Sequence, residues 1–210
     1  MRSDPPLLLA FDTSAAHCAA ALVQGDRIRA TRREAMARGQ AERLLTMLEE
    51  VLAEGGASWA DLDALAVGVG PGNFTGLRIA VAAARGLALA LGVPAIGVNR
   101  FEALAFGHPG AVLVTLEDPR GGLFTQGFED GAARELTPGP GVLCLGFQAG
   151  ELARAAGAIA GPEDTGVDPI PIARVAATRI GDDTRPAPLY LRRADAVPAS
   201  EPETMILDDA

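Results

Sequence analysis

The chain contains no lysine: all 18 of its basic residues are arginine. It therefore has neither the amine that Schiff-base chemistry needs nor the lysine of a P-loop. Histidine and cysteine are scarce, with two of each in 210 residues. Because His17 and His108 stand far apart and no paired-histidine motif occurs, the sequence predicts no metal site. Cys18 and Cys144 are too few for a disulfide framework, which favours a reducing compartment.

Aromatic residues are also rare, at 4% of the chain, whereas 49% is apolar and 25 residues are glycine. An interior rich in small side chains lets helices and strands approach closely. The net charge of −9 is uneven, with 10 arginines against 11 acids in residues 1–110 and 8 against 16 in residues 111–210. An acidic surface repels phosphate backbones, so we expect no autonomous binding of nucleic acid.

Long hydrophobic runs of the kind that target a chain to a membrane are missing too. The run Leu7–Phe11 is too short for a secretory signal and follows the acidic Asp4. The run Leu77–Leu91 is too short to cross a bilayer and contains Arg78 and Arg85. We therefore expect a cytoplasmic protein with no membrane partner.

The most informative stretch is Ala66–Gly92, which predicts a short buried strand, a glycine-rich turn and a nearly all-apolar helix with Thr75 as its N-cap. Backbone amides at such a helix start favour an anion. The turn matches neither the P-loop nor the dinucleotide motif, because Leu77 follows Gly76 where a P-loop has lysine. Tight packing of strand against helix is an equally good interpretation.

A second polar turn, Asp12-Thr-Ser14, follows the predicted buried strand Leu7–Asp12. A carboxylate at a strand end, with hydroxyls on the next turn, can hold a metal-bound phosphate. The alternative is a polar turn that closes a hairpin, with His17 solvated or a neighbour in that hairpin. The candidate phosphate- or nucleotide-facing residues are Asp12, Thr13, Ser14, Gly70, Gly72, Thr75 and Gly76.

The rest of the chain predicts two successive sets of strands and helices. Three strands open the fold, and in the third, Arg27–Arg33, Ile28 and Ala30 are expected to face inward. A shorter set of the same order follows a break at Gly107–Gly110, which indicates two related lobes. The other predicted elements are strands at Cys18–Val23, Leu65–Val69, Ala95–Val98, Ala111–Leu116, Leu123–Phe128, Ala133–Leu136, Val142–Leu145 and Ala187–Arg193, and helices at Gln40–Glu54, Arg100–Phe106, Gln148–Ala156 and Ile172–Ile180.

Two long helices, Gln40–Glu54 and Leu77–Leu91, predict an interface. The second is apolar nearly all round and must be covered on both sides, yet a sheet covers only one. The other cover is either the first helix, in ordinary core packing, or a partner. The candidate interface residues are Leu44, Leu45, Leu48, Val51, Leu52, Arg78, Ala80, Ala83, Ala84 and Leu87.

Several segments closely resemble the TsaB (YeaZ) family of bacteria. They are Leu9–Ser14, Leu65–Ile79, Gly86–Ala90, Pro94–Val98, Pro171–Ala173 and Pro188–Arg192. The resemblance covers nearly the whole chain, and its most specific part is the Gly-Pro-Gly-x-Phe-Thr-Gly-x-Arg string. One departure is Gln40-Ala41, where relatives often carry histidine followed by serine or threonine.

For the fold, the resemblance implies an α/β, actin-like (sugar kinase/Hsp70/actin, ribonuclease H-like) protein of two lobes with a reduced second lobe. Residues 1–106 would form the N-terminal actin-like lobe with the two long helices. Residues 107–186 would form the smaller C-terminal lobe. Residues 187–210 would return to the first lobe, with a disordered end.

For the function, the resemblance implies a non-catalytic subunit and activator of the complex that forms N6-threonylcarbamoyladenosine beside the anticodon of tRNA. Its partners would be a catalytic TsaD-like subunit, bound through the two long helices, and a TsaE-like ATPase. Alone it would form a homodimer, and it would meet tRNA only through the complex. No cofactor would be bound tightly by this chain, since ATP and a metal ion belong to the partner complex. The alternative is a small actin-like ATPase or kinase, or a metal-less glycoprotease-like protein, acting alone.

Overall fold

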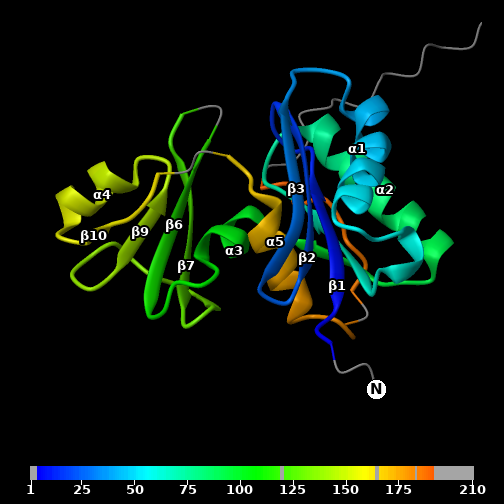
Figure 1. Ribbon diagram of the computed structural model, residues 1–210. Coiled ribbons are helices and arrows are strands. Elements are labelled where there is room, and N and C mark those ends of the chain that lie inside the picture. The colour runs from blue at the N-terminus through cyan, green and yellow to red at the C-terminus, as the bar shows by residue number, and fades with distance from the viewer. Residues whose placement is uncertain (1–3, 119–120, 164–165, 183, 192–210) are drawn as a thin grey trace, which may run out of the picture.

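The computed structural model describes residues 4–118, 121–163, 166–182 and 184–191. They form two five-stranded sheets that stand side by side, with helices on their faces (Figure 1). The first sheet has the order β3-β2-β1-β4-β5 and contains β1 (Leu7–Asp12), β2 (His17–Gln24), β3 (Arg27–Ala35), β4 (Ala64–Gly68) and β5 (Ala95–Val98). The second has the order β10-β9-β6-β7-β8 and contains β6 (Ala111–Glu117), β7 (Leu123–Glu129), β8 (Ala132–Arg134), β9 (Leu143–Gly146) and β10 (Ile159–Ala160).

Both sheets share one topology. Strands β1, β2 and β3 are antiparallel neighbours, while β4 and β5 extend the sheet parallel to β1. Strands β6, β7 and β8 repeat the antiparallel part, and β9 and β10 repeat the parallel part. The predicted repetition of strand order is therefore confirmed, although β10 was not foreseen because two residues give no periodic pattern.

Helices cover both faces of the first sheet. On the face turned away from the second lobe lie α1 (Gln40–Glu54) and α2 (Phe74–Leu91), and on the other lies α5 (Pro169–Ala177) (Figure 1). The second sheet packs against α3 (Arg100–Ala105) on one face and α4 (Ala149–Ala156) on the other. A short 3-10 turn, Trp59–Asp61, joins α1 to β4 behind a Ser58 cap.

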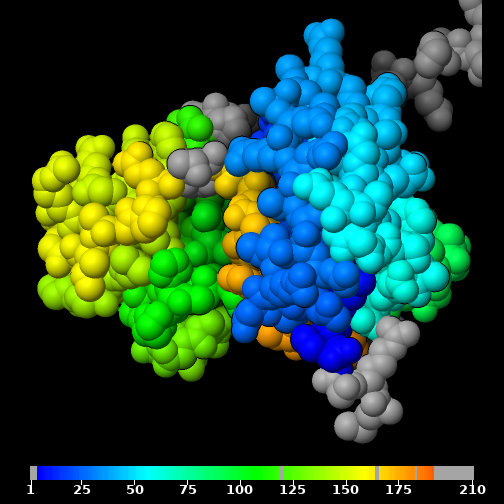
Figure 2. Space-filling model, in the orientation of Figure 1, coloured from blue at the N-terminus to red at the C-terminus, as the bar shows by residue number. Residues whose placement is uncertain are grey.

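The lobes exchange helices. Helix α3 follows β5 of the first sheet but packs on the second, whereas α5 follows β10 of the second sheet but packs on the first. We expected α5 in the second lobe, and this placement was wrong: Ile172, Ala173 and Ala176 are buried against the strands of the first sheet. Figure 2 shows the two lobes as separate masses with α5 between them. The chain thus returns to the first sheet before residue 187.

Two strand predictions were wrong for local reasons. A register shift between Leu22 and Val23 leaves Ile28 opposite Val23 and Ala30 opposite Leu22, so Ile28 and Ala30 lie on opposite faces of β3. Ala30 is buried, but Ile28 is 43% exposed. In the tail, the described residues 187–191 form no strand, and residues 192–193 lie outside the described part, as does the end predicted to be disordered.

The sequence explains how α1 and α2 form. In α1, Leu44, Leu48 and Val51 recur at helical spacing and make one buried apolar stripe. Helix α2 ends where the sequence predicted, at Gly92, whose φ of 69° places it in the left-handed region. Its N-cap is Asn73 and not Thr75, because the Asn73 side chain accepts a hydrogen bond from the Gly76 N–H at 3.0 Å.

Candidate functional site

A buried polar corner lies where β1 ends. Asp12 Oδ1 accepts hydrogen bonds from the Ser14 N–H at 2.7 Å and from the Ser14 hydroxyl at 2.8 Å. His17 Nε2 lies 3.1 Å from the same oxygen, and all three residues are at most 2% exposed. A hydrolase triad needs the histidine between serine and carboxylate. Here both side chains converge on one carboxylate oxygen, so the arrangement positions the turn and does not activate Ser14.

The start of α2 packs directly against this corner. The buried Thr13 hydroxyl donates to the Gly76 carbonyl at 2.7 Å, and the Asn73 N–H donates to the Ser14 carbonyl at 2.6 Å. A Cβ atom on Gly76 would lie 1.9 Å from the Thr13 oxygen, and one on Gly72 would lie 2.5 Å from the Ser14 oxygen. The glycines are therefore needed because the Asp12–Ser14 turn occupies the space beside them. Tight packing of strand against helix explains this turn.

The other two candidate residues point elsewhere. Gly70, with φ of 98°, accepts a hydrogen bond from the Arg100 N–H at 2.8 Å and stands against Leu77. Thr75 is exposed and lines a groove of about 510 Å³ between the starts of α1 and α2, together with Gln40. Of the seven predicted phosphate-facing residues, five meet at the polar corner. Within the described ranges, no group of three His, Cys, Asp or Glu side chains could hold a metal ion.

The predicted interface needs a correction. Six of its ten residues are buried in the core of the first lobe, each at most 2% exposed, so a partner cannot reach them: Leu44, Leu48, Val51, Leu52, Ala80 and Ala84. The helical pattern correctly identified these residues as an apolar stripe. The prediction that the stripe contacts a partner was wrong, because it packs in the chain's own core. Of the remaining four, Leu45 is 50% exposed, Arg78 is exposed, and Ala83 and Leu87 are half-buried.

The side of α2 that is open to solvent carries a different set of residues. The name α1–α2 outer face is used here for eleven of the exposed residues of the two helices: Ala41, Glu42, Leu45, Thr46 and Glu49 of α1, and Thr75, Arg78, Ala82, Gly86, Leu89 and Ala90 of α2. Its most exposed large apolar side chain is Leu89, at 88%. By length and composition α2 could cross a membrane, but here one side of it packs on the sheet.

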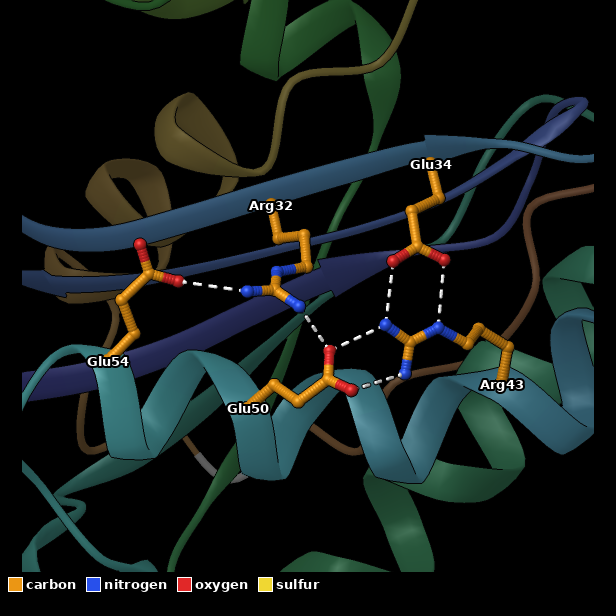
Figure 3. A network of polar contacts seen from close by, with 5 residues as sticks. All are labelled: Arg32, Glu34, Arg43, Glu50 and Glu54. Atoms are coloured by element: carbon orange, nitrogen blue, oxygen red, sulfur yellow. Dashed lines mark hydrogen bonds and ion pairs between the residues drawn. The ribbon is translucent and has the colours of Figure 1, made fainter.

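An ion-pair network holds α1 to the edge strand β3 (Figure 3). Arg43 donates to both carboxylate oxygens of Glu34, at 2.6 and 2.8 Å, and to both of Glu50, at 2.5 and 3.0 Å. Arg32 extends the network to Glu50 and, at 3.3 Å, to Glu54. Hydrogen bonds from Arg43 lower the pKa of Glu34 and of Glu50. The network fixes α1 against β3.

Comparisons with known proteins decide the family. A family model described as TsaD, tRNA N6-adenosine threonylcarbamoyltransferase, matches residues 27–121. An uncharacterized protein of Mycobacterium tuberculosis is 37% identical over 172 residues, which cover 77% of this chain and 79% of that protein. The TsaB protein of Escherichia coli is 40% identical over 100 residues, 48% of this chain and 43% of its own. The structure of YeaZ from Pseudomonas aeruginosa matches with a TM-score of 0.69 and 25% identity, over 89% of this chain and 100% of that one.

The chain belongs to the TsaB (YeaZ) family. The predicted actin-like, two-lobed α/β fold is confirmed by the YeaZ match and by the repeated strand order. The part that matches the TsaD model includes α1, β4, the glycine turn and α2. These elements carry the α1–α2 outer face and the glycines that pack against the polar corner, whereas Asp12, Ser14 and His17 themselves lie before the matched part.

Sequence reasoning missed three kinds of residue in this TsaB-family chain. For His17 the solvated alternative was wrong and the hairpin neighbour was right, but its burial against Asp12 across the β1–β2 hairpin was not foreseen. Asn73 was overlooked as the cap. Arg43 gave no signal, because its carboxylate partner Glu34 lies on a strand that only the tertiary fold brings near.

Proposed function

We propose that this chain takes part in making N6-threonylcarbamoyladenosine in tRNA, as the non-catalytic subunit that binds and activates a TsaD-like transferase. In this proposal a TsaE-like ATPase joins the complex, and ATP and a metal ion are held by the partners. The chain meets tRNA only within the complex, forms a homodimer when it is alone, and acts in the cytoplasm.

The observation that carries the proposal is the α1–α2 outer face. It combines small residues, Ala82 and Gly86, with the exposed Leu89 and Leu45, and it lies on the side of the first lobe away from the second. Small residues let a partner helix approach closely, and exposed aliphatic side chains supply apolar area. The Escherichia coli and Haemophilus influenzae relatives carry the name tRNA threonylcarbamoyladenosine biosynthesis protein TsaB, which supports the process.

The polar corner supports the non-catalytic part of the proposal. Asp12 is the carboxylate best placed to hold a metal-bound phosphate, yet its Oδ1 atom is taken by Ser14 and His17. Its Oδ2 atom packs against Gly68, since a Cβ atom on Gly68 would lie only 1.9 Å from this oxygen. A corner filled by its own chain favours a structural role over phosphoryl transfer.

Reconstitution tests the proposal. The purified chain, the TsaD-like protein and the TsaE-like protein of the same organism are assayed for threonylcarbamoyl transfer to tRNA, singly and together. We expect no transfer by this chain alone and a large loss when it is omitted from the mixture. Transfer by the isolated chain would overturn the non-catalytic role, and unchanged transfer without it would overturn the activator role.

Calorimetry separates the proposal from the alternative of an independent ATPase or kinase. We expect no micromolar binding of ATP with Mg²⁺ by the isolated chain. Binding that is lost in Asp12→Ala would favour the alternative.

The outer face is tested with Leu89→Glu, which should abolish capture of the TsaD-like protein in co-expression. Its matched control is Ile159→Glu, since Ile159 is also exposed, at 55%, but lies in the second lobe.

A further inference from the structure

An aromatic cluster sits at the start of α2. The Phe74 and Tyr190 ring centroids are 5.1 Å apart, and the Arg78 guanidinium carbon lies 3.7 Å from the Phe74 ring centroid. Arg78 Nε also donates a hydrogen bond to the Tyr190 hydroxyl at 3.1 Å. The cluster joins two distant parts of the chain, because Tyr190 belongs to the C-terminal segment 184–191.

That segment is firmly attached to the first lobe. The Leu189 N–H donates to the Val69 carbonyl at 2.7 Å, and the Leu189 side chain packs on the core. Arg85 Nε donates to the Pro186 carbonyl at 2.8 Å. Tyr190 is thus carried by a fixed backbone, and both charged residues of α2 face this segment. Stacking and the hydroxyl bond together hold Arg78 in one orientation.

The cluster is nevertheless open to solvent. Phe74 and Tyr190 are 44% and 42% exposed, and the adjoining Leu191 is 39% exposed. Single exposed apolar residues are ordinary, but here two exposed rings contact each other and an oriented arginine, so they form a patch. Tyrosine and arginine are also the residue types that most often dominate binding energy at protein interfaces.

Arg78 differs from the arginines that build the fold. Arg32, Arg43 and Arg179 are each ion-paired with a glutamate of the chain. No carboxylate of the described residues lies within ion-pair distance of Arg78, although the whole chain carries a net charge of −9. Its Nε donates to Tyr190, and its two Nη groups donate no hydrogen bond to the part of the chain that the structure describes. A planar guanidinium held in this way matches a carboxylate, which it can bind through two hydrogen bonds.

We propose that Phe74, Arg78 and Tyr190 form a preformed docking site for a carboxylate side chain on the TsaD-like subunit. The inference rests on the proposed function and adds the C-terminal segment to the binding surface beside the α1–α2 outer face. The Arg78 Nη groups bind the carboxylate, while the two rings contact the apolar atoms around it. A phosphate of tRNA is disfavoured because the chain is strongly acidic.

Titration calorimetry with the purified TsaD-like subunit tests the site. We expect Arg78→Gln to weaken the Kd about 10-fold or more, because one partner of a desolvated charge pair is lost. Arg78→Lys should bind hardly better than Arg78→Gln, since lysine keeps the charge but neither the stacking nor the paired donors. Tyr190→Phe, which keeps the ring and frees Arg78, should weaken binding about 3-fold by the loss of one hydrogen bond. The matched control is Arg154→Gln, an exposed arginine on α4, which should bind as the wild type does.

The outcomes separate this inference from the proposed function. If the wild-type chain does not bind the TsaD-like subunit, the proposed function fails. If the wild type binds and Arg78→Gln binds equally well, only the docking site is overturned. Full restoration by Arg78→Lys would mean that general charge and not geometry matters, and would also overturn it. So would an effect of Arg78→Gln confined to self-association, or to tRNA binding by the assembled complex. Circular dichroism melts confirm that each variant is folded.

Discussion

The two lobes use the same strand order but differ in their helices. Between β3 and β4 the first lobe inserts the 15-residue α1, whereas residues 135–142, between β8 and β9, form no helix. Between β4 and β5 it inserts the 18-residue α2, whereas the second lobe has the 8-residue α4 in the corresponding place. The second lobe keeps the sheet and loses most of the helical layer.

The comparison separates what the fold requires from what is specific to one lobe. Both lobes place a glycine against the backbone carbonyl of a threonine in or next to the first strand of the sheet: a Cβ on Gly76 would lie 1.9 Å from the Thr13 oxygen, and one on Gly146 would lie 2.1 Å from the Thr115 oxygen. Close approach of this kind is therefore common to both lobes. The α1–α2 outer face exists only on the first lobe, which is why we place the binding function there.

The largest effect should come from charging the buried side of α1. Leu48 is fully buried, so Leu48→Glu forces a carboxylate into the core and should lower the free energy of unfolding by about 4 kcal/mol or more. Leu45→Glu, on the exposed side of the same helix, should change it by less than about 0.5 kcal/mol. Urea denaturation of both variants measures the difference. Equal stability of the two would contradict the assignment of the buried stripe.

A smaller but still large effect is expected at the glycine turn. Gly76→Ala should lower the free energy of unfolding by about 3 kcal/mol, because its Cβ collides with the backbone of Thr13. On the same helix, a Cβ atom on Gly86 would meet no heavy atom within 4 Å, so Gly86→Ala should raise stability by about 0.5–1 kcal/mol through helix propensity. Urea denaturation of the two variants checks the expected loss of stability in Gly76→Ala and the expected gain in Gly86→Ala.

The same measurement on the second lobe extends the comparison. Gly146→Ala should also destabilise strongly, since Gly146 combines a φ of 98° with the close approach to Thr115. If only Gly76→Ala were destabilising, close approach would not be a shared requirement of the two lobes.

The ion-pair network makes the stability of the first lobe depend on pH. The pKa values of Glu34 and Glu50 are lowered in the folded protein, so the stability that they add is present above their ordinary value of 4.5 and is lost as the pH falls through the folded values. Arg43→Met should therefore lower the urea midpoint at neutral pH, and the gap to the wild type should narrow as the pH falls below the ordinary glutamate value of 4.5, or in high salt. A gap that did not change with pH would assign the effect of Arg43 to packing.

The smallest effect concerns the cysteines, one in each lobe. Burial raises the pKa of Cys18 to about 11 and also raises that of Cys144. Since the thiolate is the reactive form, both should react with a disulfide reagent at about pH 8 much more slowly than in the unfolded chain. Thiol titration with and without denaturant measures this, and fast labelling of the native protein would contradict the burial of both.

The local sequence pattern was enough to predict most of the helices and strands of the first lobe. Alternation and apolar runs located β1, β2, β4 and β5, and helical periodicity located α1 with both of its ends. The stretch Ala66–Gly92 placed the end of α2 correctly, at Gly92. These features depend on neighbours within a few residues, and the sequence contains that information directly.

Contacts between distant residues could be decided only by the tertiary structure. The sequence identified the apolar stripes of α1 and α2 but could not tell the chain's own core from a partner, because both offer the same apolar environment. It could not place His17 on Asp12, Arg43 on Glu34 or α5 on the first sheet, since each depends on how separate elements pack. The motif strings of the sequence by themselves indicated the family, whereas the exposed surface that a partner can reach emerged only once the chain had folded.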